Sequence, residues 1–240
     1  MSSAELIALL EHGDLTVKGR MPWSSNATYL AEVCLAGTTA LAVYKPARGE
    51  RPLWDFPSGL GRREVAAYLL SEALGWGVVP ETVWRESAPM GPGSVQRFVD
   101  ADFEHHYFTL YEHEDERWHD QLRRICVFDL LANNTDRKSG HCLYVPSEGD
   151  GGRIYAIDNG LSFHAEFKLR TVIWEFGGEP IPDDLLADVE RFVEAGIPDD
   201  LARLLDPFER EALLARGRAL VRERRFPIDG TGRRYPWPLV

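Results

Sequence analysis

Two short segments carry side chains whose types and spacing suit phosphoryl transfer. In the run NNTDRKSGH at residues 133–141, the acid Asp136 precedes the base Lys138 by two residues and the candidate metal ligand His141 by five. A second acid, Asp158, follows a short apolar run and begins the turn sequence Asp-Asn-Gly. Phosphoryl transfer needs a carboxylate near the acceptor hydroxyl, a cation on the transferring phosphate and groups that hold Mg²⁺. The two segments therefore predict a reaction class without naming a substrate.

Each of these residues has a proposed role and an ordinary alternative. We expect Asp136 to orient or deprotonate the acceptor hydroxyl and Lys138 to stabilise charge on the transferred group. Asp158 would hold the metal ion, with His141 as a second ligand or as a hydrogen-bond partner of phosphate or of Asp136, since Mg²⁺ prefers oxygen. A lone aspartate is also typical of a turn, and Asp-Asn-Gly is strong turn chemistry. The spacing of 22 residues between the two acids, across a predicted hairpin, favours the chemical role.

A lysine–glutamate pair is predicted upstream of these segments. Lys45 ends an alternating apolar run, and Glu64 lies 19 residues later in a helical pattern. In phosphotransferases such a lysine pairs with the α- and β-phosphates and with a helix acid. Ser24, Ser25 and Asn26 lie in the first hairpin turn, where small side chains and backbone N–H groups can cradle phosphate. The same residues also suit an ordinary hairpin turn.

The elements that must position these side chains fall into two groups. Alternating runs predict five strands, at residues 15–21, 27–35, 38–44, 78–84 and 93–99. Helical periodicity predicts helices at 1–13, 62–74, 122–131, 183–195 and 207–224, with a hairpin at 142–157. The predicted fold class is α+β: a small antiparallel β-lobe with one helix (residues 1–100), an acidic linker or insert (101–120) and a larger, mainly helical lobe (121–240). We place the ligand site in the cleft between the lobes.

Composition narrows the class of partner. A net charge of -11 and a pI near 5.1 argue against nucleic acid or an anionic membrane held by bulk electrostatics. The three cysteines form no CxxC pair and indicate a reduced, intracellular protein. No run reaches the roughly 18 apolar residues of a membrane span, and the N-terminus does not have the pattern of a signal peptide. The histidines show no zinc-like spacing. The expected localisation is cytoplasmic.

The combined motifs resemble the atypical kinases, in particular phosphatidylinositol 3-/4-kinase-type catalytic domains and HipA-type kinases. More narrowly, the chain from about residue 12 to 238 resembles an actinobacterial family described as phosphatidylinositol 3-/4-kinase-like. The segments VYKP (43–46), RPLWDFP (51–57), WGVVP (76–80) and NTDRK (134–138) carry this resemblance. The chain departs from it in three places: it has His141 where such kinases have asparagine, Asp-Asn-Gly where they have a DFG-like turn, and no GxGxxG loop.

The resemblance implies a two-lobed, protein-kinase-like fold that holds ATP and Mg²⁺, or Mn²⁺, between its lobes. It also implies a hinge at residues 95–100, where Gln96, Phe98 and Val99 would meet adenine through the backbone. The expected function is an ATP- and Mg²⁺-dependent phosphotransferase that acts on a hydroxyl of a protein, sugar, lipid or metabolite. An AMP-transferase, a nucleotide-binding pseudokinase and a metal hydrolase remain as alternatives.

Three further features stay open at this point. Trp54 and Trp174 lie in predicted loops and either shape an acceptor site or pack in the core. Ser162 and Thr171 follow Asp158 and are candidate sites of self-phosphorylation. The oligomeric state is not determined by the sequence.

Overall fold

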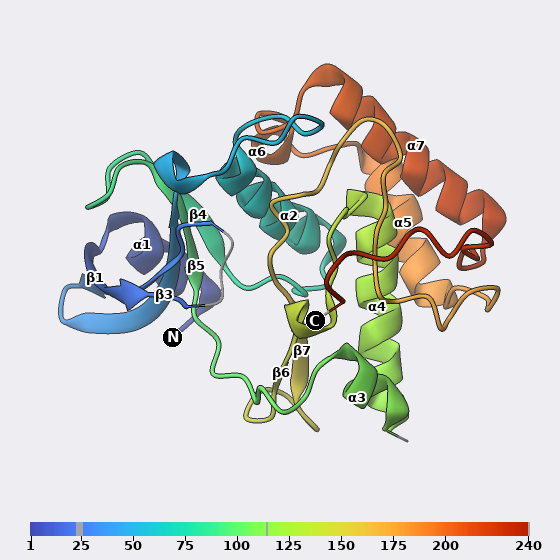
Figure 1. Ribbon diagram of the computed structural model, residues 1–240, viewed down its shortest axis with the longest axis horizontal. Coiled ribbons are helices and arrows are strands. Elements are labelled where there is room, and N and C mark those ends of the chain that lie inside the picture. The colour runs from blue at the N-terminus through green and yellow to red at the C-terminus, as the bar shows by residue number, and fades with distance from the viewer. Residues whose placement is uncertain (23–25, 114, 240) are drawn as a thin grey trace.

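The structure, a computed structural model, describes residues 1–22, 26–113 and 115–239. The first part of the chain forms an antiparallel sheet with the strand order β1-β2-β3-β5-β4. Its strands are β1 (Asp14–Arg20), β2 (Tyr29–Leu35), β3 (Thr38–Pro46), β4 (Thr82–Arg85) and β5 (Gly93–Arg97). The helix α1 (Ser3–His12) packs on this sheet, and α2 (Leu60–Leu74) connects β3 to β4. Figure 1 shows this β-lobe on the left and a larger helical lobe on the right.

Alternate side chains along the strands are buried and form the core of the β-lobe. Ala31 and Val33 of β2 and Ala42 and Tyr44 of β3 have no exposed surface and share one cluster with Leu10 of α1. The intervening side chains face outward, as expected of a sheet with period-two alternation. A capping box between Ser2 and Glu5 satisfies backbone donors at the start of α1.

The helical lobe contains α3 (Tyr107–Glu112), α4 (Glu116–Ala132), α5 (Asp183–Ala195), α6 (Asp199–Ala202) and α7 (Pro207–Glu223). The hairpin of β6 (Cys142–Val145) and β7 (Arg153–Ala156) lies near α4, and short 3₁₀ turns occupy Ala47–Gly49 and Ser139–His141. The largest hydrophobic cluster joins these helices to Leu70 and Leu74 of α2. Helix α2 therefore belongs to the packing of both lobes, in agreement with its central place in Figure 1.

Two expected elements differ from the observed ones. The strand expected at 78–84 begins only at Thr82, because the backbone N–H groups of Val78 and Val79 donate to Oγ of Ser71 at 2.8 and 3.3 Å and cap the end of α2. The stretch expected to be a linker, 101–120, contains α3 and the start of α4, where the Asp115 side chain caps the helix by accepting from the N–H of Arg117. The division of the chain at residues 100 and 120 stays a prediction.

The segment after α7 returns to the middle of the molecule (Figure 1). The carbonyl of Arg234 accepts from the N–H of Thr171 at 3.0 Å and from Nε1 of Trp174 at 3.2 Å. The carbonyl of Leu239 accepts from the N–H of Ser139 at 2.8 Å. The C-terminal segment thus contacts the loop that follows α4.

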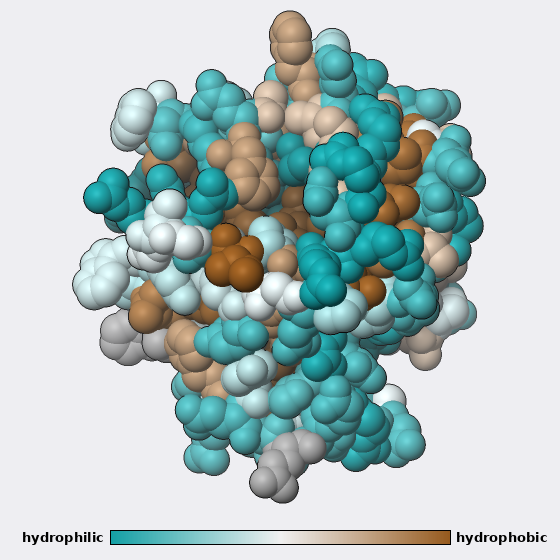
Figure 2. Space-filling model, turned by 90° about the vertical axis from the view of Figure 1, so that its right-hand side faces the viewer, coloured by the Kyte–Doolittle hydropathy of each residue, from teal (hydrophilic) through white to brown (hydrophobic). Residues whose placement is uncertain are grey.

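The outer surface is mostly polar. On the face seen in Figure 2, hydrophilic residues predominate and apolar ones are scattered among them. Across the described residues, every helix is too short or too polar to span a membrane.

Candidate active site

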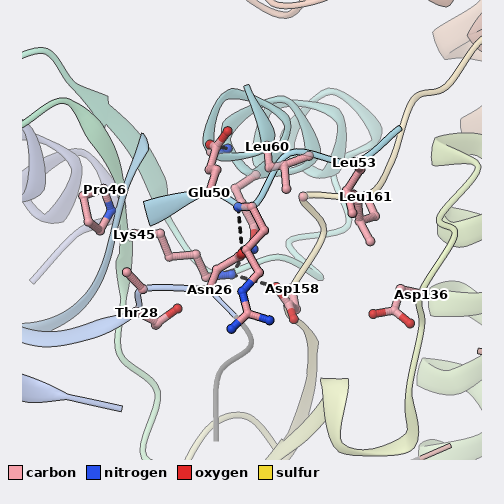
Figure 3. A pocket seen from close by; sticks show the side chains of 15 residues that line it. Asn26, Thr28, Lys45, Pro46, Glu50, Leu53, Leu60, Asp136, Asp158 and Leu161 are labelled. Carbon is pink, nitrogen blue, oxygen red and sulfur yellow. Dashed lines mark hydrogen bonds and ion pairs between the residues drawn. The ribbon is translucent and has the colours of Figure 1, made fainter. Parts of the chain in front are cut away.

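Two cavities lie between the lobes and share the lining residues Thr28, Lys45 and Asp158. The first has a volume of about 270 Å³ and includes the carboxylates of Glu64 and Asp136 in its wall. The second, about 260 Å³, is more apolar and is lined by residues from both lobes, among them Met21, Val43, Phe98, Val99, Leu143 and Ile157. Figure 3 shows the first cavity, with Asp136 across the open space from Lys45. The shared wall is where the predicted site residues meet.

Lys45 joins the two lobes at this wall. It lies near the end of β3, and its Nζ is 2.5 Å from Oε1 of Glu64 and 2.8 Å from Oδ1 of Asp158. Burial alone would lower the pKa of Lys45, but the carboxylates of Asp158 and Glu64 together raise it well above its ordinary value. The other oxygen of Glu64 accepts the backbone N–H of Asn159 at 2.9 Å. The structure therefore brings the predicted lysine–glutamate pair together and ties it to the turn after β7.

Asp158 occupies a strained position in that turn. Its φ is +57°, in the left-handed region that aspartate tolerates better than most residues. The neighbouring charge of Lys45 holds the pKa of Asp158 well below its usual range, although burial acts in the opposite direction. The side chain remains half exposed to the cleft, so a charged carboxylate faces the cavities.

His141 lies beside Asp158. Its Nε2 is 3.5 Å from Oδ2 of Asp158, and its Nδ1 is 3.0 Å from the carbonyl oxygen of Asp136. Burial lowers the pKa of His141 to about 4, so the ring is neutral near pH 7. When Nδ1–H donates to that carbonyl, Nε2 presents a lone pair toward the carboxylate.

This donor pair fits a divalent cation. Adjacent ligands of an octahedral ion with bonds of about 2.1 Å lie about 3 Å apart, close to the separation of Nε2 and Oδ2. No group of three His, Cys, Asp or Glu side chains suited to a metal occurs in the described residues, so phosphate oxygens and water would complete the coordination. A carboxylate with an imidazole suits Mn²⁺ as well as Mg²⁺.

Asp136 lies across the first cavity from Lys45, with Lys138 beside it. Lys138 Nζ is 3.5 Å from Oδ2 of Asp136, and the backbone N–H of Asp136 donates to Oδ1 of Asn134 at 2.9 Å. Burial raises the pKa of Asp136 to about 6, against the opposing influence of Lys138. A carboxylate with a pKa nearer neutrality accepts a proton more effectively than an ordinary aspartate.

Arg137 has a role that its sequence position did not reveal. Its side chain is fully buried, and it donates to both oxygens of Asp129, to Oδ1 of Asn159 at 2.6 Å and to the carbonyl of Ile157 at 2.5 Å. It thereby connects α4, the loop of Asp136 and the turn of Asp158. The available signal was Asp129, a lone acid in the apolar run ICVFDLL, because a buried carboxylate needs a cationic partner.

A second buried arginine fixes α2 to the helical lobe. Arg63, next to Glu64, donates to the carbonyl of Ser162 at 2.6 Å and forms an ion pair with Glu209 in the first turn of α7. Both charged side chains are almost completely buried. Arg63 thus anchors α2 next to Glu64 and supports the position of the Glu64 side chain toward Lys45.

The predicted hinge is only partly available to a ligand. Gln96 belongs to β5, where it pairs with Val43 and Thr82, and its side chain donates to Oγ1 of Thr82 at 2.8 Å. The N–H of Phe98 donates to the carbonyl of Leu41 at 3.1 Å. Gln96, Phe98 and Val99 nevertheless all line the second cavity, and their contact with adenine stays a prediction. Within the described part of the chain, the N–H of Val99 donates no hydrogen bond and faces no such competition.

The remaining expected residues are placed as follows. Ser24 and Ser25 lie outside the described residues, whereas Oδ1 of Asn26 accepts the N–H of Arg51 at 3.2 Å. Trp54 is 97% exposed and follows Leu53, a residue of the first cavity. Trp174 packs against the C-terminal segment. Ser162 and Thr171 are buried, so neither is accessible as a self-phosphorylation site in this conformation.

Several solved structures share this architecture, and two of the following three are named as kinases. The Golgi casein kinase with Mn and ADP bound has a TM-score of 0.65 at 14% identity over 99% of this chain and 80% of its own. The hydra Fam20 structure with sugar has a TM-score of 0.58 at 12% identity over 92% and 88%. The Helicobacter pylori proinflammatory kinase CtkA has a TM-score of 0.56 at 11% identity over 90% and 94%. At these identities the likeness shows the fold, and the fold is kinase-like, with a β-lobe and a helical lobe as expected.

The sequence itself shows a nearer relative. Protein Rv2133c of Mycobacterium tuberculosis is 38% identical over an alignment of 266 positions, gaps included, which covers 96% of this chain and 94% of the relative. The chain belongs to the family of Rv2133c. No family model matches the sequence. The narrower resemblance to phosphatidylinositol 3-/4-kinases and HipA-type kinases stays a prediction.

Proposed function

We propose that the protein is an ATP-dependent phosphotransferase that uses a divalent metal ion and a hydroxyl acceptor. The observation that carries this proposal is the position of Lys45, which bridges Glu64 and Asp158 at the wall between two cavities. A lysine held by a helix acid and a metal-site acid is the arrangement that phosphoryl transfer uses. Asp136, the proposed base, faces the first cavity (Figure 3).

The two cavities suggest how the nucleotide lies. The second cavity is mostly apolar and is lined by Val99, whose N–H donates no hydrogen bond among the described residues; both features suit adenine. The phosphates would then pass Lys45 and enter the first cavity, where the carboxylates lie. The Mn and ADP in the Golgi casein kinase structure support nucleotide binding in a cleft of this fold.

The residues divide the reaction between them. The acceptor oxygen attacks the γ-phosphorus, its proton passes to the Asp136 carboxylate, and the bond from the γ-phosphorus to the β,γ-bridging oxygen breaks to release ADP. Lys138, beside Asp136, stabilises charge on the transferred group. Asp158 and His141 would hold a divalent metal ion, which would supply positive charge near the phosphates. The hydrogen bond from Arg137 to Asn159 fixes the relative positions of the segments that carry these side chains.

The proposal is tested by titrating the protein with ATP in the calorimeter, with Mg²⁺ or Mn²⁺ and without metal. We expect metal-dependent binding that Asp158→Asn weakens and that Asp150→Asn, a fully exposed control in the β6–β7 loop, leaves unchanged. Absence of binding to the wild type would identify a scaffold and remove the catalytic roles. Incubation of the protein and candidate acceptors with ATP labelled at the α- or the γ-phosphate then separates AMP transfer from phosphoryl transfer, which labels the product only from the γ-position.

A further inference from the structure

The first cavity contains a cation that the roles above leave unused. Arg51 lines this cavity together with Lys45, Asp136 and Asp158. Among the described residues, its side chain makes no hydrogen bond and no ion pair. An arginine that faces several carboxylates yet pairs with none of them is available to an anion.

The carboxylates of the same cavity already have partners. Glu64 and Asp158 bind Lys45, and Asp136 lies near Lys138. Glu50 accepts the backbone N–H groups of Gly59 and Gly61 at 3.1 and 2.8 Å. Arg51 is therefore the charged residue of the described wall whose exposed side chain has no protein partner, and its guanidinium is available to an anionic ligand.

A close backbone approach places Arg51 in the cavity. The carbonyl of Gly49 accepts the N–H of Ala27 at 3.4 Å, and the N–H of Arg51 donates to Asn26. A Cβ on Gly49 would lie 2.4 Å from the Cβ of Ala27, so this contact requires glycine. The segment after β3 is thus fastened against the first hairpin turn, and Arg51 follows directly from that contact.

The two cavities show which part of the nucleotide Arg51 would meet. Arg51 and Asp136 both line the first cavity, and neither lines the second, apolar one. Asp136 has to reach the acceptor hydroxyl, which attacks the terminal phosphorus. Arg51 therefore lies at the end of the cleft where the acceptor and the γ-phosphate meet.

We propose that Arg51 binds the γ-phosphate of ATP and stabilises its oxygens while the phosphoryl group is transferred. The proposal rests on the phosphotransferase function proposed above and adds a catalytic residue to it. Arg51 forms no covalent bond and exchanges no proton, because the guanidinium stays protonated throughout. Its two-pronged donor geometry suits phosphate oxygens better than the point charge of lysine.

The test compares nucleotides that differ in their number of phosphates. For Arg51→Ala we expect affinity for ATP to fall about tenfold while affinities for ADP and AMP stay within about twofold, and kcat to fall about 10²-fold. Arg51→Lys would recover part of the loss. The matched control is Arg48→Ala, an exposed arginine three residues earlier that lines neither cavity.

Each result has a distinct meaning. Failure of the wild type to bind any nucleotide would remove the proposed function itself. Normal ATP affinity and turnover in Arg51→Ala, an equal loss for AMP, or a change confined to the acceptor KM would overturn the role of Arg51 and leave the proposed function standing. Gly49→Ala gives an independent check, because displacement of the loop should reproduce the selective loss of ATP affinity with Arg51 intact. An unchanged ATP affinity in Gly49→Ala would contradict the positioning by this contact.

Discussion

Two clusters of oppositely charged side chains meet at the turn after β7, and they differ in their exposure to solvent. In the cleft, Lys45 bridges Glu64 and Asp158, and the Asp158 side chain is half exposed. In the second cluster, Arg137 and Asp129 form an ion pair whose side chains are at most 1% exposed. Arg137 also donates to Asn159 and to the carbonyl of Ile157. We call Lys45, Glu64 and Asp158 the upper cluster, which is open toward the two cavities. The buried pair of Arg137 and Asp129 is the lower cluster, which is closed to solvent.

The difference shows how one turn serves both chemistry and stability. A half-exposed carboxylate can exchange its partner for a metal ion or phosphate with little desolvation. A buried pair with complete hydrogen bonding can exchange nothing, and it fixes the geometry of its neighbours instead. We therefore expect substitutions in the upper cluster to change activity, and substitutions in the lower cluster to change stability first.

The largest effect is expected for Asp158→Asn. Loss of the carboxylate should lower turnover about 10⁴-fold, equivalent to about 5.5 kcal/mol, because the metal loses its protein oxygen ligand. The melting temperature should change little, since the side chain is half exposed. ADP release and thermal denaturation measure turnover and melting temperature on the same sample. A large loss of stability with unchanged turnover would reverse the contrast between the clusters.

Arg137→Met should have the next largest effect, on stability. Removing one partner of a buried ion pair leaves Asp129 uncompensated and costs about 3–5 kcal/mol of unfolding free energy. Urea denaturation measures it, with Arg222→Met, an exposed arginine of α7, as the control. The double variant Asp129→Leu with Arg137→Met removes both charges and should recover part of the loss. No recovery would mean that the hydrogen bonds to Asn159 and Ile157 dominate.

Arg63→Met tests the buried ion pair between Arg63 of α2 and Glu209 of α7. Because Arg63 and Glu209 are buried together, we expect a loss of about 3 kcal/mol in unfolding free energy. Turnover should also fall, since Glu64 is the next residue and would no longer be held toward Lys45. Arg62→Met is the matched control, because this neighbouring arginine is half exposed and its pair with Glu86 contributes about 0–1 kcal/mol. Equal stability of both variants would argue against the link.

The smallest expected change in stability has the opposite sign. Burial raises the pKa of Asp136 to about 6 in the folded protein, above the value of about 3.9 in unfolded chains. Folding therefore favours the protonated acid, and the wild type loses stability as the pH rises from about 4 to 6. Asp136→Asn should remove turnover, keep nucleotide affinity and raise the unfolding free energy at pH 7 by about 1–2 kcal/mol.

The pH dependence separates this effect from ordinary packing. The gain in Asp136→Asn should disappear below about pH 4, where the wild-type carboxyl is protonated in both states. In the wild type, kcat/KM should rise with pH and level off above about 6 as the base ionises. A pH-independent gain, or activity that falls as Asp136 ionises, would contradict the assignment of a buried base.

Much of the fold was predictable because the relevant signals are local. The runs at 27–35 and 183–195 have clear periodicity, and β2 and α5 match them closely. The start of β4 was missed because Val78 and Val79 have strong β-propensity but bind Ser71 instead. The start of α4 was missed because acidic residues at 112–116 suggested a solvated linker, whereas Asp115 acts as a helix cap.

The candidate site was predictable where residue type alone indicates chemistry. Lys45, Glu64, Asp136 and Asp158 were selected by charge and spacing, and the structure brings them to the lining of one cavity. Arg137 was missed because its importance depends on burial between α4 and the β7 turn, which spacing does not encode. Gln96 was selected by analogy, and its hydrogen bonds within the β-lobe became visible only in three dimensions.

The path of the C-terminal segment affects how this protein is handled. Leu239 accepts the N–H of Ser139, one residue after Lys138, so the end of the chain is part of the support of the loop that bears Asp136. An affinity tag or reporter fused after Leu239 would lie close to that loop. Removal of residues 234–239 would leave the donors of Ser139, Thr171 and Trp174 without their acceptors. The N-terminus lies at the β-lobe, apart from the C-terminus (Figure 1), and is the safer place for a label.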